Sequence, residues 1–367
     1  MGLTKLGSLI QIREERNDAD FNLPFYGINI NKEFMPSVAN TDGVDRKKYK
    51  IVRKNKFVFS GMQTGRDVCI RIGLYTDDEP VLVSPAYTTF EVTSPLIIPT
   101  YLFMIFCSKE KDRLGWFLSD SSVRSNLDWD RFCGIQIDLP SIEIQKKYVD
   151  IYNSLIDNLK IFEKGSDDLS LICDGTIEKW RKESSSPIGS RLIESHEINS
   201  QSEKLPELGV SISKTLINTK AVSSDQTNQK IVRPGRFVYV TVTSRNGGAC
   251  SIALDRDILC SVSSSYCTFD VTKDLYPPYL DMWFKRKEFN RFARFHSWGT
   301  TREVFPIEAI ENYRISIPNI EKQISVAKIS DCLLDRQKIV ARLKSLIWTI
   351  SPILIKGSVE EEHRGKL

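Results

Sequence analysis

A long internal repeat constrains the fold of this chain more than any single motif does. Short words recur in the same order along the 367 residues, at separations of 178 to 182 positions. The repeated words are Leu23-Pro24 with Leu205-Pro206, Lys50–Phe59 with Lys230–Tyr239, Tyr87–Thr93 with Tyr266–Thr272, Pro99–Leu102 with Pro277–Leu280, and Ile137–Gln145 with Ile315–Gln323. Each copy is too long for a solenoid repeat and long enough to enclose its own hydrophobic core. The sequence therefore predicts two tandem domains of one kind.

Each copy begins with short β-type runs that are separated by Gly, Asp, Asn and Pro turn residues. The predicted strands of the first copy are Phe57–Ser60, Val68–Leu74, Pro80–Ser84 and Thr88–Val92. Those of the second copy are Phe237–Thr243, Cys250–Leu254 and Cys267–Val271. Both copies are thus expected to open with a β-rich domain.

A helical pattern follows the last repeated word of each copy. Ser141 and Asn319 are predicted N-caps, and Glu143 and Glu321 complement the helix dipole in the first turn. Apolar residues then recur every three or four positions: Tyr148, Ile151, Leu155, Leu159 and Phe162 in the first helix, and Val326, Ile329, Leu333, Val340, Leu343 and Ile347 in the second. So narrow a stripe favours packing against a partner helix, which the other copy supplies. We expect a pause at Gly165-Ser166 and an end at Ser351-Pro352.

Composition excludes several classes of protein. With 41% hydrophobic residues, 27% charged residues and a net charge of +4, the chain is typical of a globular protein. The longest apolar stretch, Leu96–Cys107, is too short to cross a bilayer, and the N-terminus lacks the apolar segment of a secretory signal. We therefore expect a cytoplasmic protein without a membrane partner.

Signatures of catalysis are weak. The eight cysteines form no CxxC pair, and the three histidines have no metal-ligand spacing. Tyr276–Tyr279 (YPPY) resembles the loop with which amino-methyltransferases hold an adenine, but Tyr276 cannot provide the short acceptor that this chemistry needs. No P-loop or glycine-rich nucleotide motif is present. The sequence thus predicts neither a catalytic residue nor a metal site.

Basic and polar residues instead indicate DNA binding. Seven positive charges without an acid lie within residues 46–56, of which Lys47, Lys48 and Lys54 are candidate phosphate contacts. Two loop segments occupy equivalent places in the copies, and they carry the side chains that read base edges. The candidate readers are Gln63, Thr64, Arg66, Ser122, Arg124 and Asn126 in the first copy, and Ser244, Arg245, Asn246, Thr300, Thr301 and Arg302 in the second. Because these residues differ between copies, we expect two different half-sites.

The order of these parts resembles the specificity subunit of type I restriction-modification systems, over residues 3–357. The resemblance implies an α+β protein in which two β-rich target-recognition domains are each followed by a long helix, with the helices packed as an antiparallel coiled coil. It implies that each domain reads one half of an interrupted DNA site and that the helices bind two adenine-methyltransferase subunits. Restriction/translocase subunits would complete the complex, and S-adenosylmethionine, ATP and magnesium would belong to those partners.

The expected boundaries are a first recognition domain at 1–140, a first helical region at 141–183, a second recognition domain at 184–317, a second helical region at 318–356 and a charged tail at 357–367. A helix of about 30 residues is ~45 Å long, comparable to one turn of DNA. Two alternatives stay open: the recognition subunit of a type II-like system, and a tandem module that binds proteins or carbohydrates.

Overall fold

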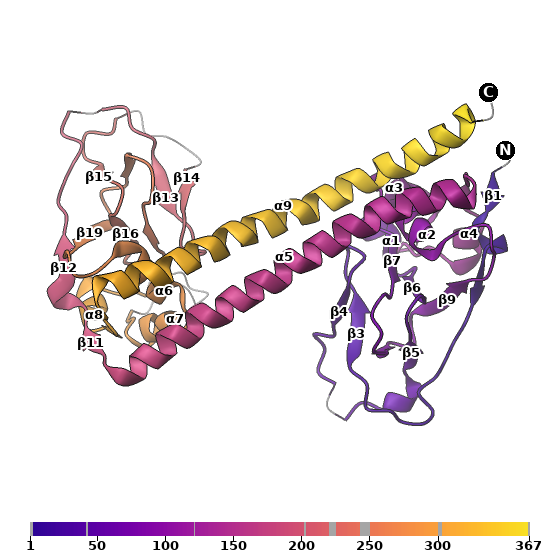
Figure 1. Ribbon diagram of the computed structural model, residues 1–367, viewed down its shortest axis with the longest axis horizontal. Helices are drawn as coiled ribbons and strands as arrows, with labels where there is room; N and C mark the ends of the chain where they lie inside the picture. Colours follow the sequence, from indigo (N-terminus) through magenta and orange to yellow (C-terminus); the bar gives the residue numbers. More distant parts are fainter. Residues whose placement is uncertain are drawn as a thin grey trace. The chain divides into compact units, whose positions relative to one another are not determined.

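The chain divides into two compact units, which are seen in a computed structural model (Figure 1). The structure describes residues 3–41, 43–120, 122–201, 203–219, 225–242, 250–299 and 303–365. Unit 1 comprises Met1–Ile161 and Ile339–Leu367, and unit 2 comprises Phe162–Lys338. Two long helices, α5 (Ile142–Glu183) and α9 (Ile320–Arg364), each contribute one part to each unit. The fold is α+β.

Unit 1 contains two four-stranded sheets. The first has the strand order β2 (Ile10–Ile12), β9 (Thr88–Val92), β6 (Phe57–Ser60) and β7 (Arg71–Leu74); the second has the order β4 (Phe34–Pro36), β3 (Phe25–Ile28), β8 (Val81–Val83) and β5 (Lys50–Val52). A further pair joins β1 (Thr4–Lys5) to β10 (Gln136–Ile137). The shorter helices are η1 (Leu6–Ser8), η2 (Arg46–Lys48), α1 (Thr64–Asp67), α2 (Pro99–Phe106), α3 (Lys109–Leu118) and α4 (Trp129–Cys133).

Unit 2 repeats this strand order. Its four-stranded sheet has the order β12 (Leu192–Glu194), β19 (Cys267–Val271), β16 (Phe237–Tyr239) and β17 (Ile252–Leu254). The remaining pairs are β13 (Leu208–Val210) with β14 (Leu216–Asn218), β15 (Lys230–Val232) with β18 (Cys260–Val262), and β11 (Ser186–Pro187) with β20 (Arg314–Ile315). The shorter helices are η3 (Gly189–Arg191), α6 (Pro277–Lys285), α7 (Lys287–Phe295) and α8 (Ile307–Glu311).

Aromatic residues from the repeated words build equivalent cores. Phe57 stacks on Phe90 at a ring distance of 4.8 Å in unit 1, and Phe237 stacks on Phe269 at 5.1 Å in unit 2. All four side chains are fully buried. Burial of rings of this size accounts for much of the hydrophobic stabilisation of each core. The repeated words therefore mark core positions.

Most predicted strands are confirmed, although several are shorter than the sequence indicates. Phe57–Ser60, Thr88–Val92 and Cys267–Val271 have the predicted bounds. The run at Val68–Leu74 yields a strand only from Arg71, because Val68 adopts a left-handed conformation at the end of α1. The strand predicted at Phe237–Thr243 ends at Tyr239, and Thr243 lies outside the described residues.

A buried glutamine explains the repeated word that precedes each long helix. The Gln145 side chain donates to the carbonyls of Leu96 (2.8 Å) and Pro140 (2.9 Å) and accepts from the Ile98 amide (3.0 Å). Gln323 donates to the carbonyls of Asp274 and Pro318 and accepts from the Tyr276 amide, at 2.8 Å in each case. Each glutamine thus satisfies buried backbone groups that precede α2 or α6 and ties that segment to the start of the long helix.

The bounds of the long helices correct two predictions. Asn319 caps α9 as predicted, since its side chain accepts from the Lys322 amide. However, α5 continues without a pause through Gly165-Ser166, and α9 continues through Pro352 to Arg364. The predicted charged tail at 357–367 is therefore wrong as far as the structure describes it. A proline inside a helix costs about 3 kcal/mol. Burial of Ile347 and Leu354 in unit 1 offsets this cost, and the buried Ser358 hydroxyl is satisfied by the Tyr101 hydroxyl at 2.7 Å.

The two long helices run side by side within each unit (Figure 1). In unit 1, Tyr148, Leu155 and Leu159 of α5 and Ile347 of α9 join one core cluster, together with Val149 and Tyr152, which the predicted stripe omits. In unit 2, Ile329 packs on the core, and the Arg336 guanidinium lies over the Phe162 ring. Leu333, Val340 and Leu343 are half-buried. Ile151 is 42% exposed, so its assignment to the stripe is wrong.

None of the helices in the described ranges is long and apolar enough to span a membrane.

Candidate nucleic-acid interface

The two polar loops of unit 1 lie against each other. The backbone amide of Leu127 donates to the Gly61 carbonyl at 2.9 Å, and that of Gly65 donates to the Ser125 carbonyl at 2.9 Å. The Asn126 side chain adds a third link by accepting from the Gln63 amide at 3.1 Å. Segments that lie some 60 positions apart in the sequence therefore form one surface.

Glycine makes this close approach possible. A Cβ on Gly61 would lie 1.8 Å from the Leu127 carbonyl oxygen, and a Cβ on Gly65 would lie 1.9 Å from the Ser125 hydroxyl oxygen. Real Cβ atoms do not approach other atoms this closely. Both glycines are thus required for the contact between the loops.

Three non-glycine residues in these loops adopt a left-handed backbone conformation: Gln63 (φ 60°), Val68 (φ 47°) and Ser125 (φ 51°). The conformation is unfavourable for such residues, and most of all for a β-branched valine. The cost is of order 1–3 kcal/mol per residue, and residues of this kind concentrate at functional sites. The backbone strain therefore supports a ligand-contact role for this surface.

The Asp120 carboxylate holds the loop at residues 119–126 in shape by accepting hydrogen bonds from it. The carboxylate accepts from the Ser122 amide and hydroxyl and from the Asn126 amide, at 3.1, 2.6 and 2.9 Å. The hydrogen bond from the Ser122 hydroxyl is the main reason why the pKa of Asp120 lies below its ordinary value. Ser122 and Asn126, which we predicted to read DNA, therefore also hold the shape of the loop.

The remaining predicted readers of unit 1 differ in exposure. Arg66 and Arg124 are exposed, and Gln63 is half-buried. Thr64 is completely buried, and its hydroxyl donates to the Gly61 carbonyl at 3.0 Å, so the prediction that Thr64 contacts DNA is corrected to a structural role. The surface also exposes Met62 and Val123. The available side chains thus combine two guanidinium groups, one amide and an apolar rim.

Unit 2 joins its loops with an equivalent hydrogen bond. The Phe305 amide donates to the Thr241 carbonyl at 2.8 Å, which corresponds to the Leu127–Gly61 bond of unit 1. Val304 forms bridges with both Val242 and Trp298, so the two segments leave the core next to each other. The predicted readers Ser244, Arg245, Asn246, Thr300, Thr301 and Arg302 lie outside the described residues.

The run of basic residues at 46–56 is largely neutralised by acids from other parts of unit 1. Lys48, Lys50, Arg53, Lys54 and Lys56 pair with Asp45, Glu14, Glu15, Asp78 and Glu91, respectively. Arg46 stacks on the Phe25 ring at 4.9 Å. The expectation of a continuous free basic patch is therefore corrected. Lys47 and Lys48 remain exposed, and Lys54 shares its charge with Asp78.

Two of these ion pairs recur in unit 2, where sequence reasoning did not anticipate them. Arg233 pairs with Glu197 as Arg53 pairs with Glu15. Arg236 bonds to Asp270 through two nitrogens at 3.0 Å, in the place of the Lys56–Glu91 pair. The basic residues of the repeated word therefore hold adjacent strands together. The repeated acids Glu91 and Asp270, in the words YTTFEVT and YCTFDVT, were the available signal.

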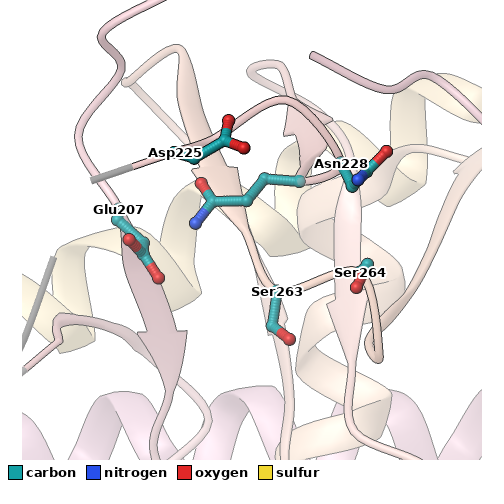
Figure 2. Close-up of a pocket in the computed structure, with 6 residues that line it drawn as sticks. Glu207, Asp225, Asn228, Ser263 and Ser264 are labelled. Atoms are coloured by element: carbon teal, nitrogen blue, oxygen red, sulfur yellow. The ribbon is translucent and has the colours of Figure 1, made fainter. Parts of the chain in front are cut away.

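Unit 2 also contains a polar pocket of about 230 Å³. It is lined by Glu207, Asp225, Asn228, Gln229, Ser263 and Ser264. Figure 2 labels five of these residues, Gln229 excepted, around the pocket. Its carboxylates disfavour nucleic-acid phosphates. Within the described ranges, no three His, Cys, Asp or Glu residues are grouped so that they could hold a metal ion. The paired loops are thus the better candidate for nucleic-acid contact.

Comparisons with known proteins point to a DNA specificity domain. Residues 5–169 match the family model described as the type I restriction modification DNA specificity domain. The specificity subunit of the type I restriction enzyme HindI from Haemophilus influenzae is 19% identical over 154 residues. That match covers 41% of this chain and 33% of the relative, so the chain spans about a third of the length of this relative.

The fold is also similar to that of a solved specificity protein. The S subunit of a type I restriction-modification system from M. genitalium superposes with a TM-score of 0.60 and 11% identity, over 98% of this chain and 95% of that one. At this identity the likeness concerns the fold alone. Together with the family match, it confirms the resemblance that the repeated words indicated: residues 5–169 match the type I restriction modification DNA specificity domain, and the chain as a whole is similar to type I specificity subunits.

Proposed function

We propose that this chain is the DNA-recognition and scaffold subunit of a type I restriction-modification complex. Each unit presents one target-recognition domain, which reads one half of an interrupted, asymmetric DNA site. The observation that carries the proposal is the paired-loop arrangement, which the same backbone hydrogen bond closes in both units, Leu127 to Gly61 and Phe305 to Thr241. Because the loop residues differ, two like frameworks present two unlike reading surfaces.

Arginine is suited to this role in unit 1. Its planar guanidinium forms two hydrogen bonds to a guanine edge, and amide side chains such as that of Gln63 pair with adenine. Arg66 and Arg124 are exposed on the paired loops, which the buried contacts below them hold in place. The partner in this proposal is double-stranded DNA, with phosphate contacts from Lys47 and Lys48.

The long helices support the scaffold role. We infer that α5 and α9 pack as an antiparallel coiled coil. In unit 1, Tyr148 and Lys147 near the start of α5 bond to Glu361 near the end of α9, which supports this arrangement. Both helices also expose apolar side chains, among them Ile161 (67%), Leu171 (71%) and Ile353 (65%). Exposed apolar surface of this kind is typical of sites that bind other proteins.

We infer that these helix faces bind two adenine-methyltransferase subunits and that restriction/translocase subunits complete the complex. The chain itself is noncatalytic in this proposal. S-adenosylmethionine, ATP and magnesium then serve the partner subunits, and the complex acts in the cytoplasm.

An exchange of units tests the proposal. A chimera in which residues 1–140 are replaced by those of another specificity subunit is produced with its methyltransferase subunits, and the methylated motif is sequenced. We expect one half of the motif to change and the other half and the spacing to persist. A change in both halves, or in neither, would contradict the assignment of one half-site to each unit.

A further inference from the structure

A second surface is repeated in the two units, and it differs in kind from the reading loops. Helices α3 and α7 carry the same residue at four positions separated by 178: Lys109 and Lys287, Glu110 and Glu288, Arg113 and Arg291, and Phe117 and Phe295. A fifth identical pair lies just beyond the helices: Ser119 follows α3 directly, and Ser297 lies two residues after the end of α7. In the reading loop that comes next along the chain, residues 120–126 and 298–304 share only one residue at this separation, Arg124 with Arg302. The helix is thus more alike in the two copies than the loop that follows it.

The buried side of each helix is fixed by a buried lysine. In unit 1, Lys32 donates to the Asp112 carboxylate at 2.7 Å, and in unit 2, Lys214 donates to the Asn290 side chain at 2.5 Å. Both lysines lie in a left-handed turn, with φ of 62° in each case. The helix orientation is therefore set in the same way in the two units.

The end of each helix is also fixed. The Ser119 hydroxyl donates to the Gly115 carbonyl at 2.8 Å, and the Ser297 hydroxyl donates to the Ala293 carbonyl at 2.6 Å. These bonds hold the last turn, from which Phe117 and Phe295 project. The two phenylalanine side chains consequently occupy equivalent, well-defined positions.

The outer side of each helix exposes a phenylalanine and a Glu–Arg ion pair. Phe117 is 82% exposed and Phe295 is 85% exposed, which is unusual for so large an apolar side chain. Glutamate, arginine and phenylalanine follow at positions i, i+3 and i+7 and therefore share one face. The Glu110–Arg113 ion pair (3.1 Å) recurs as Glu288–Arg291 (3.4 Å). We call this outer side the Glu-Arg-Phe face.

The identity of the two faces limits what they bind. This step rests on the proposed function, in which the two half-sites have different base sequences. A side chain that is the same in both units then contacts something that is the same at both halves of the complex. The DNA backbone meets that condition, but the face carries a carboxylate beside its arginine, and a phenyl ring offers nothing to a phosphate. Two copies of one protein also meet it.

We propose that the Glu-Arg-Phe faces of α3 and α7 each bind one copy of the same protein, the methyltransferase subunit. Exposed aromatic rings and arginines are the residues that most often anchor protein interfaces. The phenyl ring would enter an apolar pocket of the partner, and Arg113 or Arg291 would pair with one of its acidic groups. Each unit thus carries its own anchor, separate from the long helices.

The stoichiometry of the complex tests this inference. The full chain and its Phe117→Ala, Phe295→Ala and double variants are mixed with the purified methyltransferase subunit, and the complexes are analysed by native mass spectrometry and titration. Each single variant should bind one methyltransferase copy as the parent does and the other about 10- to 30-fold more weakly. The double variant should bind both copies weakly. Phe21→Ala, which truncates a 53%-exposed phenylalanine between β2 and β3, should bind both copies normally.

Sequence-specific DNA binding by the same samples separates the possible failures. If the parent complex binds a bipartite site and both single variants still bind two methyltransferase copies with parental affinity, the inference is wrong and the proposed function stands. A loss of DNA affinity with unchanged stoichiometry would assign the face to DNA and also overturn it. If the parent complex shows no sequence-specific binding at all, the proposed function fails.

Discussion

Gln145 offers a sharp test of how the repeated word works, because one buried side chain satisfies three backbone groups of unit 1. Gln145→Met keeps the side-chain volume but removes these bonds. Each net hydrogen bond is worth about 0.5–1.5 kcal/mol, and a buried backbone group without a partner costs about 1–3 kcal/mol. Since two of the three bonds are only partly buried, we expect a loss of about 2–4 kcal/mol in local stability.

Amide hydrogen exchange measures this loss where it occurs. The Ile98 amide loses its acceptor in Gln145→Met, so it should exchange about 30-fold to several hundred-fold faster, whereas the Tyr276 amide should keep its parental rate. Gln323→Met should give the reciprocal result in unit 2. Gln136→Met, at an exposed position of β10, should change neither amide. Less than a threefold change at Ile98, or equal changes in both units, would refute the role assigned to Gln145.

Three other predictions concern the loops and the buried lysines. Arg124→Ala should relax one base position of one half-site by about 1–3 kcal/mol, measured by methylation of a randomised site library; equal weakening on all sequences would reassign Arg124 to phosphate. Gly61→Ala should separate the paired loops and lower the free energy of unfolding by about 1–3 kcal/mol, whereas Gly175→Ala, which has open space around it, should not destabilise the chain in urea titrations. Burial lowers the pKa of Lys214 to about 8, so folding releases a proton above that pH and the stability of unit 2 should rise between about pH 8 and 10. Asn290→Asp, which copies the Lys32–Asp112 pair of unit 1, should remove most of this rise in hydrogen-exchange measurements. A parental pH profile of stability in that variant would contradict the assignment.

The repeat made much of the fold predictable. Core aromatic residues such as Phe57 and Phe237 lie inside repeated words because both cores need the same rings in the same places. Pro99 and Pro277 begin α2 and α6, as expected because proline suits the first helical turn. Local rules and the repeat point to the same elements here, which is why these predictions succeed.

Other features depend on contacts that no local pattern contains. The sequence predicts unpaired charges in the basic run at 46–56, because their partners Glu14, Glu15 and Glu91 lie some 35 to 40 positions away in the sequence. Local rules predict that the second helix ends at Pro352, because the packing of Ile347 and Leu354 in unit 1 cannot be seen in the sequence. Ile151 fits the helical spacing, yet Val149 and Tyr152 occupy the buried side instead. Tertiary packing decided each of these cases.

In the candidate site, too, some features could be predicted from the sequence and others depended on tertiary contacts. The equivalence of the loop segments was visible in the sequence, but their direct contact through Gly61 and Leu127 was not. Polar type alone could not separate Thr64, which is buried, from Arg66 and Arg124, which are exposed. The Glu-Arg-Phe faces escaped notice because amphipathic spacing suggested that the aromatic residues of α7 belong to the core, whereas Phe295 is exposed.

If two like units read two different half-sites, the methylated DNA motif must be discontinuous. Sequencing of methylated adenines in cells that contain the chain and its methyltransferase subunit measures this motif. We expect an asymmetric motif of two short specific parts separated by a fixed stretch of unspecified bases, which disappears when the chain is deleted. A continuous or palindromic motif, or one that persists without the chain, would contradict this expectation.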